Sequence, residues 1–176
     1  MPRFFVSASP AMKTFALFVF AVLPTFAQAQ SCPVTLAQLR KMNECELTRL
    51  FESAAPGELP TGYGRGHVIR MTDAKLPRVQ ARAFGLAWKG KHFEADGAFI
   101  NQFAGFKALP GNVELGASSH DGKPCIVTQY PPGTPVFGNT WDELRQVAPG
   151  LYLARLYERC PCPRFRGYFA IELACR

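Results

Sequence analysis

A histidine and a carboxylate stand next to each other at His120 and Asp121, which is the composition of a general base with its carboxylate partner. Ser118 and Ser119 precede them but lack the Gly-x-Ser-x-Gly context of a hydrolase nucleophile. The Asp-Gly pair also lies between two strand-like runs, where it favours the tight turn of a β-hairpin. Because neighbouring residues on such a turn rarely direct both side chains at one substrate, a secreted hydrolase that uses His120 or His92 as its base is the alternative function rather than the leading one.

Asp142 and Glu143 form the one adjacent pair of acids in the chain. Two carboxyl groups are the catalytic groups of glycosidases. Thr140 and Glu143, however, match a capping box, and Asp142 is suited to the positive end of a helix dipole. The pair therefore predicts a short helix from Thr140 through Val147 rather than a catalytic site.

Six cysteines indicate a disulfide framework, because an even number in an oxidising compartment favours pairing. The spacing leaves the connectivity open, except that a bond between Cys160 and Cys162 would close a strained ring. An arrangement that pins both ends of the domain onto this segment or onto Cys125 fits the spacing. One Cys-Pro-Cys and three scattered histidines do not match a zinc site, so we expect no metal. The disulfide candidates are Cys32, Cys45, Cys125, Cys160, Cys162 and Cys175.

The oxidising compartment is predicted from residues 12–29, which have the pattern of a secretory signal peptide. Lys13 supplies the positive charge, Phe15–Phe26 the apolar run, and an Ala-x-Ala site favours cleavage after Ala29. We therefore expect residues 1–29 to be removed, with Met12 as the true initiator, and residues 30–176 to form a single periplasmic or secreted domain. The apolar run is shorter than the roughly 20 residues of a membrane span, and no later segment approaches that length, so we expect no transmembrane segment in the mature chain.

The charge pattern argues against nucleic acid as a partner. The chain carries a formal net charge of +7, spread along its length, and no run of Lys or Arg is long enough for a nucleic-acid-binding tail. The glycine-rich stretch Gly62–Gly66 matches neither dinucleotide- nor phosphate-binding motifs. We therefore expect no cofactor, and we interpret the positive charge as a solvated surface.

Local patterns predict two short helices at the start of the mature chain and strands after them. Thr35 with Gln38, and Asn43 with Glu46, form two successive capping boxes. A further apolar stripe predicts a helix over residues 76–88. The fold class is therefore α+β, with short N-terminal helices followed by an antiparallel meander that could curl into a barrel. The predicted strands cover residues 67–71, 98–103, 106–108, 113–117, 125–130, 151–157 and 164–173.

Three short motifs resemble those of uncharacterised exported bacterial proteins: Trp-x-Gly-Lys-x-Phe at Trp88–Phe93, Asp-Gly-Lys-Pro at Asp121–Pro124 and Pro-Gly-Leu-Tyr-Leu at Pro149–Leu153. The resemblance covers most of residues 46–173. It implies a small barrel of calycin-like or lipocalin-like architecture, and it implies no activity and no catalytic residues.

A barrel of this kind could enclose a small apolar or amphipathic ligand, since binding pockets are mainly apolar with a few polar anchors. Trp88, Phe93 and Tyr130 are the candidates for the apolar lining, and Lys91, His92 or Arg145 for the anchor, with nothing in the spacing to choose among the three. The leading hypothesis is accordingly an exported, non-enzymatic binding module. Besides the hydrolase, the other alternative is a structural envelope protein without a pocket.

Overall fold

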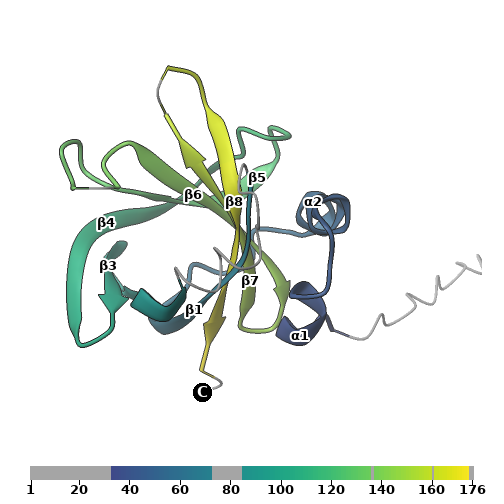
Figure 1. The fold of residues 1–176 in the computed structure, drawn as a ribbon, viewed down its shortest axis with the longest axis horizontal. Helices are drawn as coiled ribbons and strands as arrows, with labels where there is room; N and C mark the ends of the chain where they lie inside the picture. Colours follow the sequence, from purple (N-terminus) through teal and green to yellow (C-terminus); the bar gives the residue numbers. More distant parts are fainter. Residues whose placement is uncertain (1–32, 73–84, 136, 160, 175–176) are drawn as a thin grey trace, which may run out of the picture. The chain divides into compact units, whose positions relative to one another are not determined.

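The computed structural model describes residues 33–72, 85–135, 137–159 and 161–174. The predicted signal peptide, residues 1–29, and most of the predicted helix over residues 76–88 lie outside the described residues. Within them, two helices precede eight strands (Figure 1). This confirms the α+β class with N-terminal helices before an antiparallel meander.

Both helices begin at the capping boxes expected from the sequence. Helix α1 spans Leu36–Leu39 and α2 spans Glu44–Ser53. Thr35 and Asn43 each accept a hydrogen bond from the backbone N–H three residues on, and the Gln or Glu there reaches back to the cap. These local contacts place α2 with Leu47 and Phe51 facing the sheet, where both are fully buried.

The eight strands form a closed barrel in which each strand pairs with its sequence neighbours and β8 closes onto β1, antiparallel throughout. Closure removes the free edges that an open sheet would present. The strands are β1 (Gly62–Met71), β2 (Trp88–Phe93), β3 (Ala98–Phe103), β4 (Phe106–Ala117), β5 (Pro124–Gln129), β6 (Thr140–Ala148), β7 (Leu151–Glu158) and β8 (Arg164–Leu173).

The predicted helix from Thr140 through Val147 was wrong, because this segment is strand β6. Glu143 does not cap a helix; its carboxylate accepts from the Ser118 hydroxyl (2.6 Å), the Ser119 N–H (2.7 Å) and the Trp141 indole (3.1 Å). The two serine partners are distant in the sequence, and these contacts, together with pairing to both β5 and β7, outweigh a four-residue capping signal.

Strand β2 was not predicted, and Trp88 begins it although the predicted helix over residues 76–88 ended there. The other predicted strands differ from the structure mainly in extent. The runs 106–108 and 113–117 are one strand, β4, and β1 already begins at Gly62, inside the stretch expected to be a flexible entry. Strands β3 and β8 match the predicted bounds, and Asp121 lies in the connection between β4 and β5, as the Asp-Gly signal indicated.

Alternating side chains divide the buried residues into two clusters, one inside the barrel and one outside it. Ala154 and Phe169 face each other across β7 and β8 and belong to the inner cluster, whereas their neighbours Leu153 and Ala170 belong to the outer one. The outer cluster packs β1, β7 and β8 against α1 and α2, which lie to one side of the barrel in Figure 1. Strand β7 is buried on both faces, which explains the continuous apolar run over its first four residues, Leu151–Ala154.

A bulge in β2 sets which side chains of that strand point inward. The pairing with β3 shifts between Trp88 and Gly90, so Trp88 and Lys91, three residues apart, are both buried in the barrel. Gly90 has φ +135°, and a Cβ there would lie 2.0 Å from the Gly64 carbonyl oxygen on β1. Glycine at this position therefore permits both the backbone angle and the close approach of β1.

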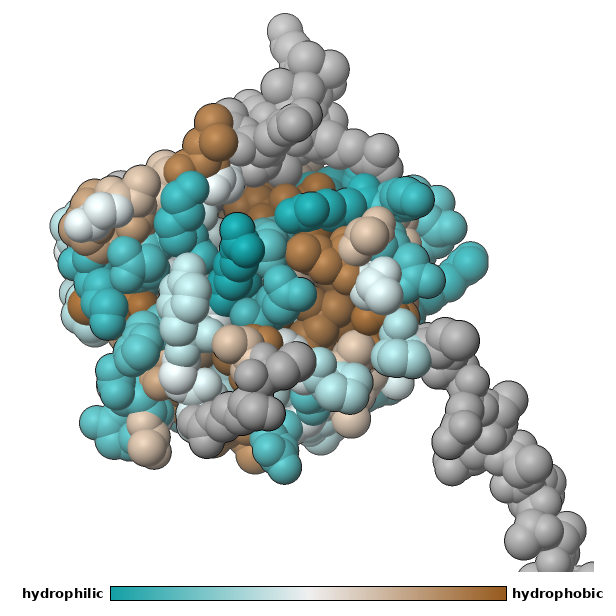
Figure 2. All heavy atoms as spheres, turned by 90° about the horizontal axis from the view of Figure 1, so that it is seen from below, coloured by the Kyte–Doolittle hydropathy of each residue, from teal (hydrophilic) through white to brown (hydrophobic). Residues whose placement is uncertain are grey.

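On the face drawn in Figure 2, hydrophilic side chains frame an apolar area. Across the described residues, five large apolar side chains are exposed, two of them on β4: Leu59, Tyr63, Leu86, Phe106 and Leu115. No helix in the described part of the chain has the length and apolarity needed to cross a membrane.

Candidate ligand-binding site in the barrel

One end of the barrel encloses a cavity of about 240 Å³. Its lining comes from the ends of β1 and β7, from the beginnings of β2, β6 and β8, from β3, and from the connection between β5 and β6. In an antiparallel meander the ends of β1 and β7 lie at the same end of the barrel as the beginnings of β2, β6 and β8. Most of the wall is apolar. The lining residues are Val68, Met71, Trp88, Lys91, Asn101, Tyr130, Phe137, Thr140, Asp142, Leu156, Glu158, Arg166, Gly167, Tyr168 and Phe169.

A buried ion pair lies below the mouth of this cavity. Lys91 Nζ is 3.2 Å from Asp142 Oδ2, with both side chains almost fully buried. The same carboxylate oxygen accepts from the Thr128 hydroxyl at 2.7 Å. Lys91 also lies over the Phe99 ring, 4.1 Å from its centre. The two charges balance, so the barrel interior holds an ion pair of net charge zero.

Asn101 and Tyr130 extend this ion pair into a polar cluster. Lys91 Nζ donates to the Tyr130 hydroxyl at 2.6 Å, and Asn101 Nδ2 donates to it at 3.0 Å. The amide of Asn101 accepts from the Trp88 indole N–H at 3.0 Å and donates to the Leu109 carbonyl at 3.0 Å. The cluster of Lys91, Asn101, Tyr130 and Asp142, here called the polar cluster, is therefore held by β2, β3, β6 and the end of β5.

Two groups of the polar cluster, Lys91 and Tyr130, keep their ordinary protonation states at neutral pH. Burial opposes the charge on Lys91, but the oxygens of Tyr130 and Asp142 outweigh it, and the pKa of Lys91 lies above the usual lysine value. Burial raises the pKa of Tyr130 despite the nearby ammonium group. Lys91 is therefore a cation rather than a nucleophilic amine, and Tyr130 is a neutral phenol.

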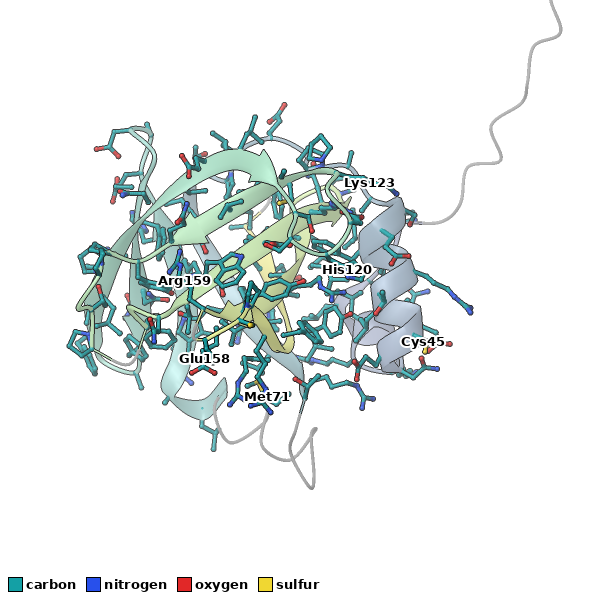
Figure 3. The ribbon with its side chains drawn as sticks, turned by 90° about the horizontal axis from the view of Figure 1, so that it is seen from above. Cys45, Met71, His120, Lys123, Glu158 and Arg159 are labelled. Carbon is teal, nitrogen blue, oxygen red and sulfur yellow. The ribbon has the colours of Figure 1, made fainter. Side chains whose placement is uncertain are left out.

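Charged residues stand at the mouth. Arg166 Nε is 3.6 Å from Glu158 Oε2, and both side chains are more than a third exposed. Met71 joins Glu158 at this end of the barrel, away from His120 and Lys123, which lie beside α2 (Figure 3). The cavity thus has a polar mouth, apolar walls and a polar cluster one layer deeper.

Comparison with known proteins gives the fold and no more. No model of a protein family matches the chain, and no curated protein matches it. The structure is similar to the crystal structure of a protein from Thermomonospora curvata, with a TM-score of 0.54 at 16% sequence identity. The match covers 76% of this chain and 89% of that one. The eight-stranded closed barrel is consistent with the calycin-like fold that the motifs implied.

The structure brings together three of the predicted ligand-binding residues. Trp88, Lys91 and Tyr130 line the cavity. Phe93 is buried in the inner core and packs beside Phe99, with ring centres 6.1 Å apart, but it does not line the cavity.

Arg145 lies in a different place from the one expected of an anchor. It is fully buried outside the barrel, with its guanidinium 2.7 and 2.8 Å from the two carboxylate oxygens of Asp121. It also donates to the Phe51 carbonyl at the end of α2 (2.9 Å), and it lies 4.5 Å from the centre of the Phe51 ring. Arg145 therefore joins α2 to the β4–β5 connection and β6, and does not face the ligand cavity.

The two histidines proposed as bases stand outside the cavity. His120 Nε2 is 2.7 Å from Glu52 on α2, and His92 Nε2 is 3.4 Å from Glu94. Neither lines the cavity described above. Among the described residues, no group of three or more His, Cys, Asp or Glu side chains is arranged to hold a metal ion.

The expected set of three disulfides is not formed. Cys45, Cys125 and Cys162 are free thiols, and they belong to α2, β5 and the β7–β8 connection. Cys125 is fully buried, which raises the pKa of its thiol to about 12. The remaining candidates, Cys32, Cys160 and Cys175, lie outside the described residues.

Sequence reasoning missed Asn101 and assigned Asp142 to a helix. The signal for Asn101 was strand alternation, because it stands two residues from both Phe99 and Phe103 and therefore shares a face of the strand with them. For Asp142 the signal was that it stands two residues from Leu144, on the same face of the strand, and Leu144 is fully buried in the inner core. Strand alternation would have placed both polar residues on the inner face.

Proposed function

We propose that this protein binds a small amphipathic molecule inside the barrel. The observation that carries the proposal is the polar cluster at the inner end of an otherwise apolar cavity. Ligand sites combine apolar walls with a few placed polar groups in this way. The apolar wall would hold the body of the ligand, and the polar cluster would bind its polar end through Tyr130.

The cavity limits the size of the ligand. Its volume of about 240 Å³ lies just below the usual range for ligand sites, about 300–1,000 Å³. It corresponds to the space that about eight water molecules occupy in the liquid. We therefore propose a compact molecule, close in size to a substituted benzene, rather than a long-chain lipid.

We further propose that the protein acts in the periplasm or outside the cell. The support is the signal-peptide pattern of residues 12–29. N-terminal sequencing of protein recovered from the periplasm or medium of the producing cell tests this. A mature N-terminus at Gln30 supports export, whereas an intact N-terminus and a cytoplasmic location would overturn it.

The binding proposal is tested by filling the cavity. Leu156 lines it, so Leu156→Trp should occupy the space and weaken the binding of acetophenone, measured by titration calorimetry, by at least tenfold. Leu115 on β4 is 61% exposed and provides the matched control, because Leu115→Trp adds the same side chain outside the barrel. Equal affinity in both variants, with both folded by circular dichroism, would place any binding elsewhere and refute the proposal. Native mass spectrometry of protein from the producing cell then identifies a bound compound.

A further inference from the structure

The amide of Asn101 has a defined orientation. Its oxygen accepts the indole N–H of Trp88 at 3.0 Å, and its nitrogen donates to the Leu109 carbonyl at 3.0 Å. The reverse orientation would oppose a donor to the indole and an acceptor to the carbonyl. The nitrogen is therefore the atom 3.0 Å from the Tyr130 hydroxyl, where it acts as a donor.

The Tyr130 oxygen consequently receives two hydrogen bonds. One comes from Asn101 and the other from Lys91 Nζ at 2.6 Å. Among the described residues, the one acceptor near its own proton is Asn101 Oδ1 at 3.4 Å. That distance exceeds the normal O–H···O range of about 2.5–3.0 Å, so this hydrogen bond is weak. The phenol proton therefore lacks a good partner within the polar cluster.

Lys91, in contrast, has no N–H group left to donate to a ligand. Its ammonium group faces the Tyr130 oxygen, the Asp142 carboxylate at 3.2 Å and the Phe99 ring at 4.1 Å. These three neighbours account for its three N–H groups. Tyr130 is thus the group in the polar cluster with a donor left for a molecule in the cavity that it lines.

We infer that the polar end of the ligand is a neutral carbonyl oxygen that accepts the Tyr130 proton. This rests on the proposed function and names the chemistry that the site selects. A carboxylate fits less well, because the charges of Lys91 and Asp142 already balance and a further buried charge would lack a partner. A hydrocarbon fits less well because it leaves the phenol proton without an acceptor.

Three probes of nearly the same shape test the inference: acetophenone, isopropylbenzene and benzoate, which carry a ketone, a hydrocarbon and a carboxylate on one ring. We expect acetophenone to bind the wild-type protein about three- to tenfold more tightly than isopropylbenzene, the range of one net hydrogen bond. Benzoate should bind more weakly than acetophenone. If none of the three binds, the proposed function fails and the inference with it. If the hydrocarbon or the carboxylate binds as tightly as the ketone, the inference alone fails.

A pair of tyrosine variants assigns the donor. Tyr130→Phe should reduce the preference for acetophenone over isopropylbenzene to about one, while Tyr63→Phe should preserve it, because the Tyr63 hydroxyl donates to the Lys89 carbonyl outside the cavity. The infrared C=O stretch of bound acetophenone should lie at a lower frequency in wild type than in Tyr130→Phe. A preference and a stretch unchanged in Tyr130→Phe would assign the acceptor to another donor and overturn the inference. The probe series on the wild-type protein stands even if Tyr130→Phe does not fold.

Discussion

Replacing Arg145 with Met is expected to destabilise the fold strongly without altering the ligand cavity. The guanidinium is fully buried, binds both oxygens of Asp121, and donates to the carbonyls of Phe51, Lys123 and Pro124. Methionine fills much of the volume but leaves the carboxylate and these carbonyls without their donor. Breaking one side of a buried pair costs about 3–5 kcal/mol, a large part of the roughly 5–15 kcal/mol that stabilises a typical domain.

Urea unfolding followed by circular dichroism measures this loss. With a slope of about 2 kcal/mol per molar urea, the midpoint should fall by about 2 M. Arg49→Met is the matched control, because Arg49 is exposed on α2 and its replacement should change stability by no more than about 0.5 kcal/mol. Equal midpoints for the two variants would refute the structural role assigned to Arg145. Acetophenone binding by folded Arg145→Met should remain at the wild-type level.

The pH dependence provides an independent check. Arg145 holds the pKa of Asp121 well below its usual range, chiefly through their hydrogen bonds. A carboxyl group whose pKa is lowered on folding contributes stability above its unfolded pKa of about 3.9, and loses it as the pH falls toward the folded value. The stability difference between wild type and Arg145→Met should therefore shrink on acidification below about pH 4. A difference that stays constant from neutral pH to about pH 2.5 would contradict this reasoning.

Three further outcomes follow from the structure. Lys91→Met should lower the free energy of unfolding by about 3–5 kcal/mol because it leaves Asp142 buried without its cation. The double variant Lys91→Met with Asp142→Leu should recover most of this loss in urea titrations. A double variant no more stable than the single one would contradict this. Iodoacetamide at about pH 8 should label exposed Cys45 but not Cys125, whose thiol has a pKa of about 12; rapid labelling of Cys125 in folded protein, read by peptide mass spectrometry, would argue against its burial. Asn43→Ala should lower the melting temperature by the equivalent of about 1 kcal/mol through loss of the α2 cap, and an unchanged temperature would make that cap dispensable.

Local signals in the sequence were sufficient for elements whose determinants are themselves local. The caps at Thr35 and Asn43 bond to residues three positions away, and Asp121 lies in the connection between β4 and β5, where an Asp-Gly pair favours a hairpin. Segment 140–148 failed for the opposite reason. Its capping pattern is short-range, whereas Asp142 bonds to groups on β2 and β5 and Glu143 to the β4–β5 connection. No window of a few residues contains those partners.

The candidate site was predicted in part. Trp88 and Tyr130 were found because large aromatic residues are either core or pocket wall, and Lys91 because a cation close to aromatic residues could anchor the polar part of a ligand. Arg145 met the same description, and the difference between it and Lys91 depends on which face of each strand is inside the barrel. The β2 bulge sets that face for Lys91, and a bulge is a property of the pairing between strands rather than of one strand.

The division of the barrel into a hollow end and a packed end has a consequence for engineering and for divergence. Phe93, Phe99, Tyr152 and Ile171 fill the interior away from the cavity, and they carry much of the inner core. Substitutions at Val68 or Leu156 therefore change the shape of the cavity while leaving that packing intact. A library restricted to the hollow end should yield new selectivities among folded variants, so this scaffold separates the residues that can be varied from those that must be kept.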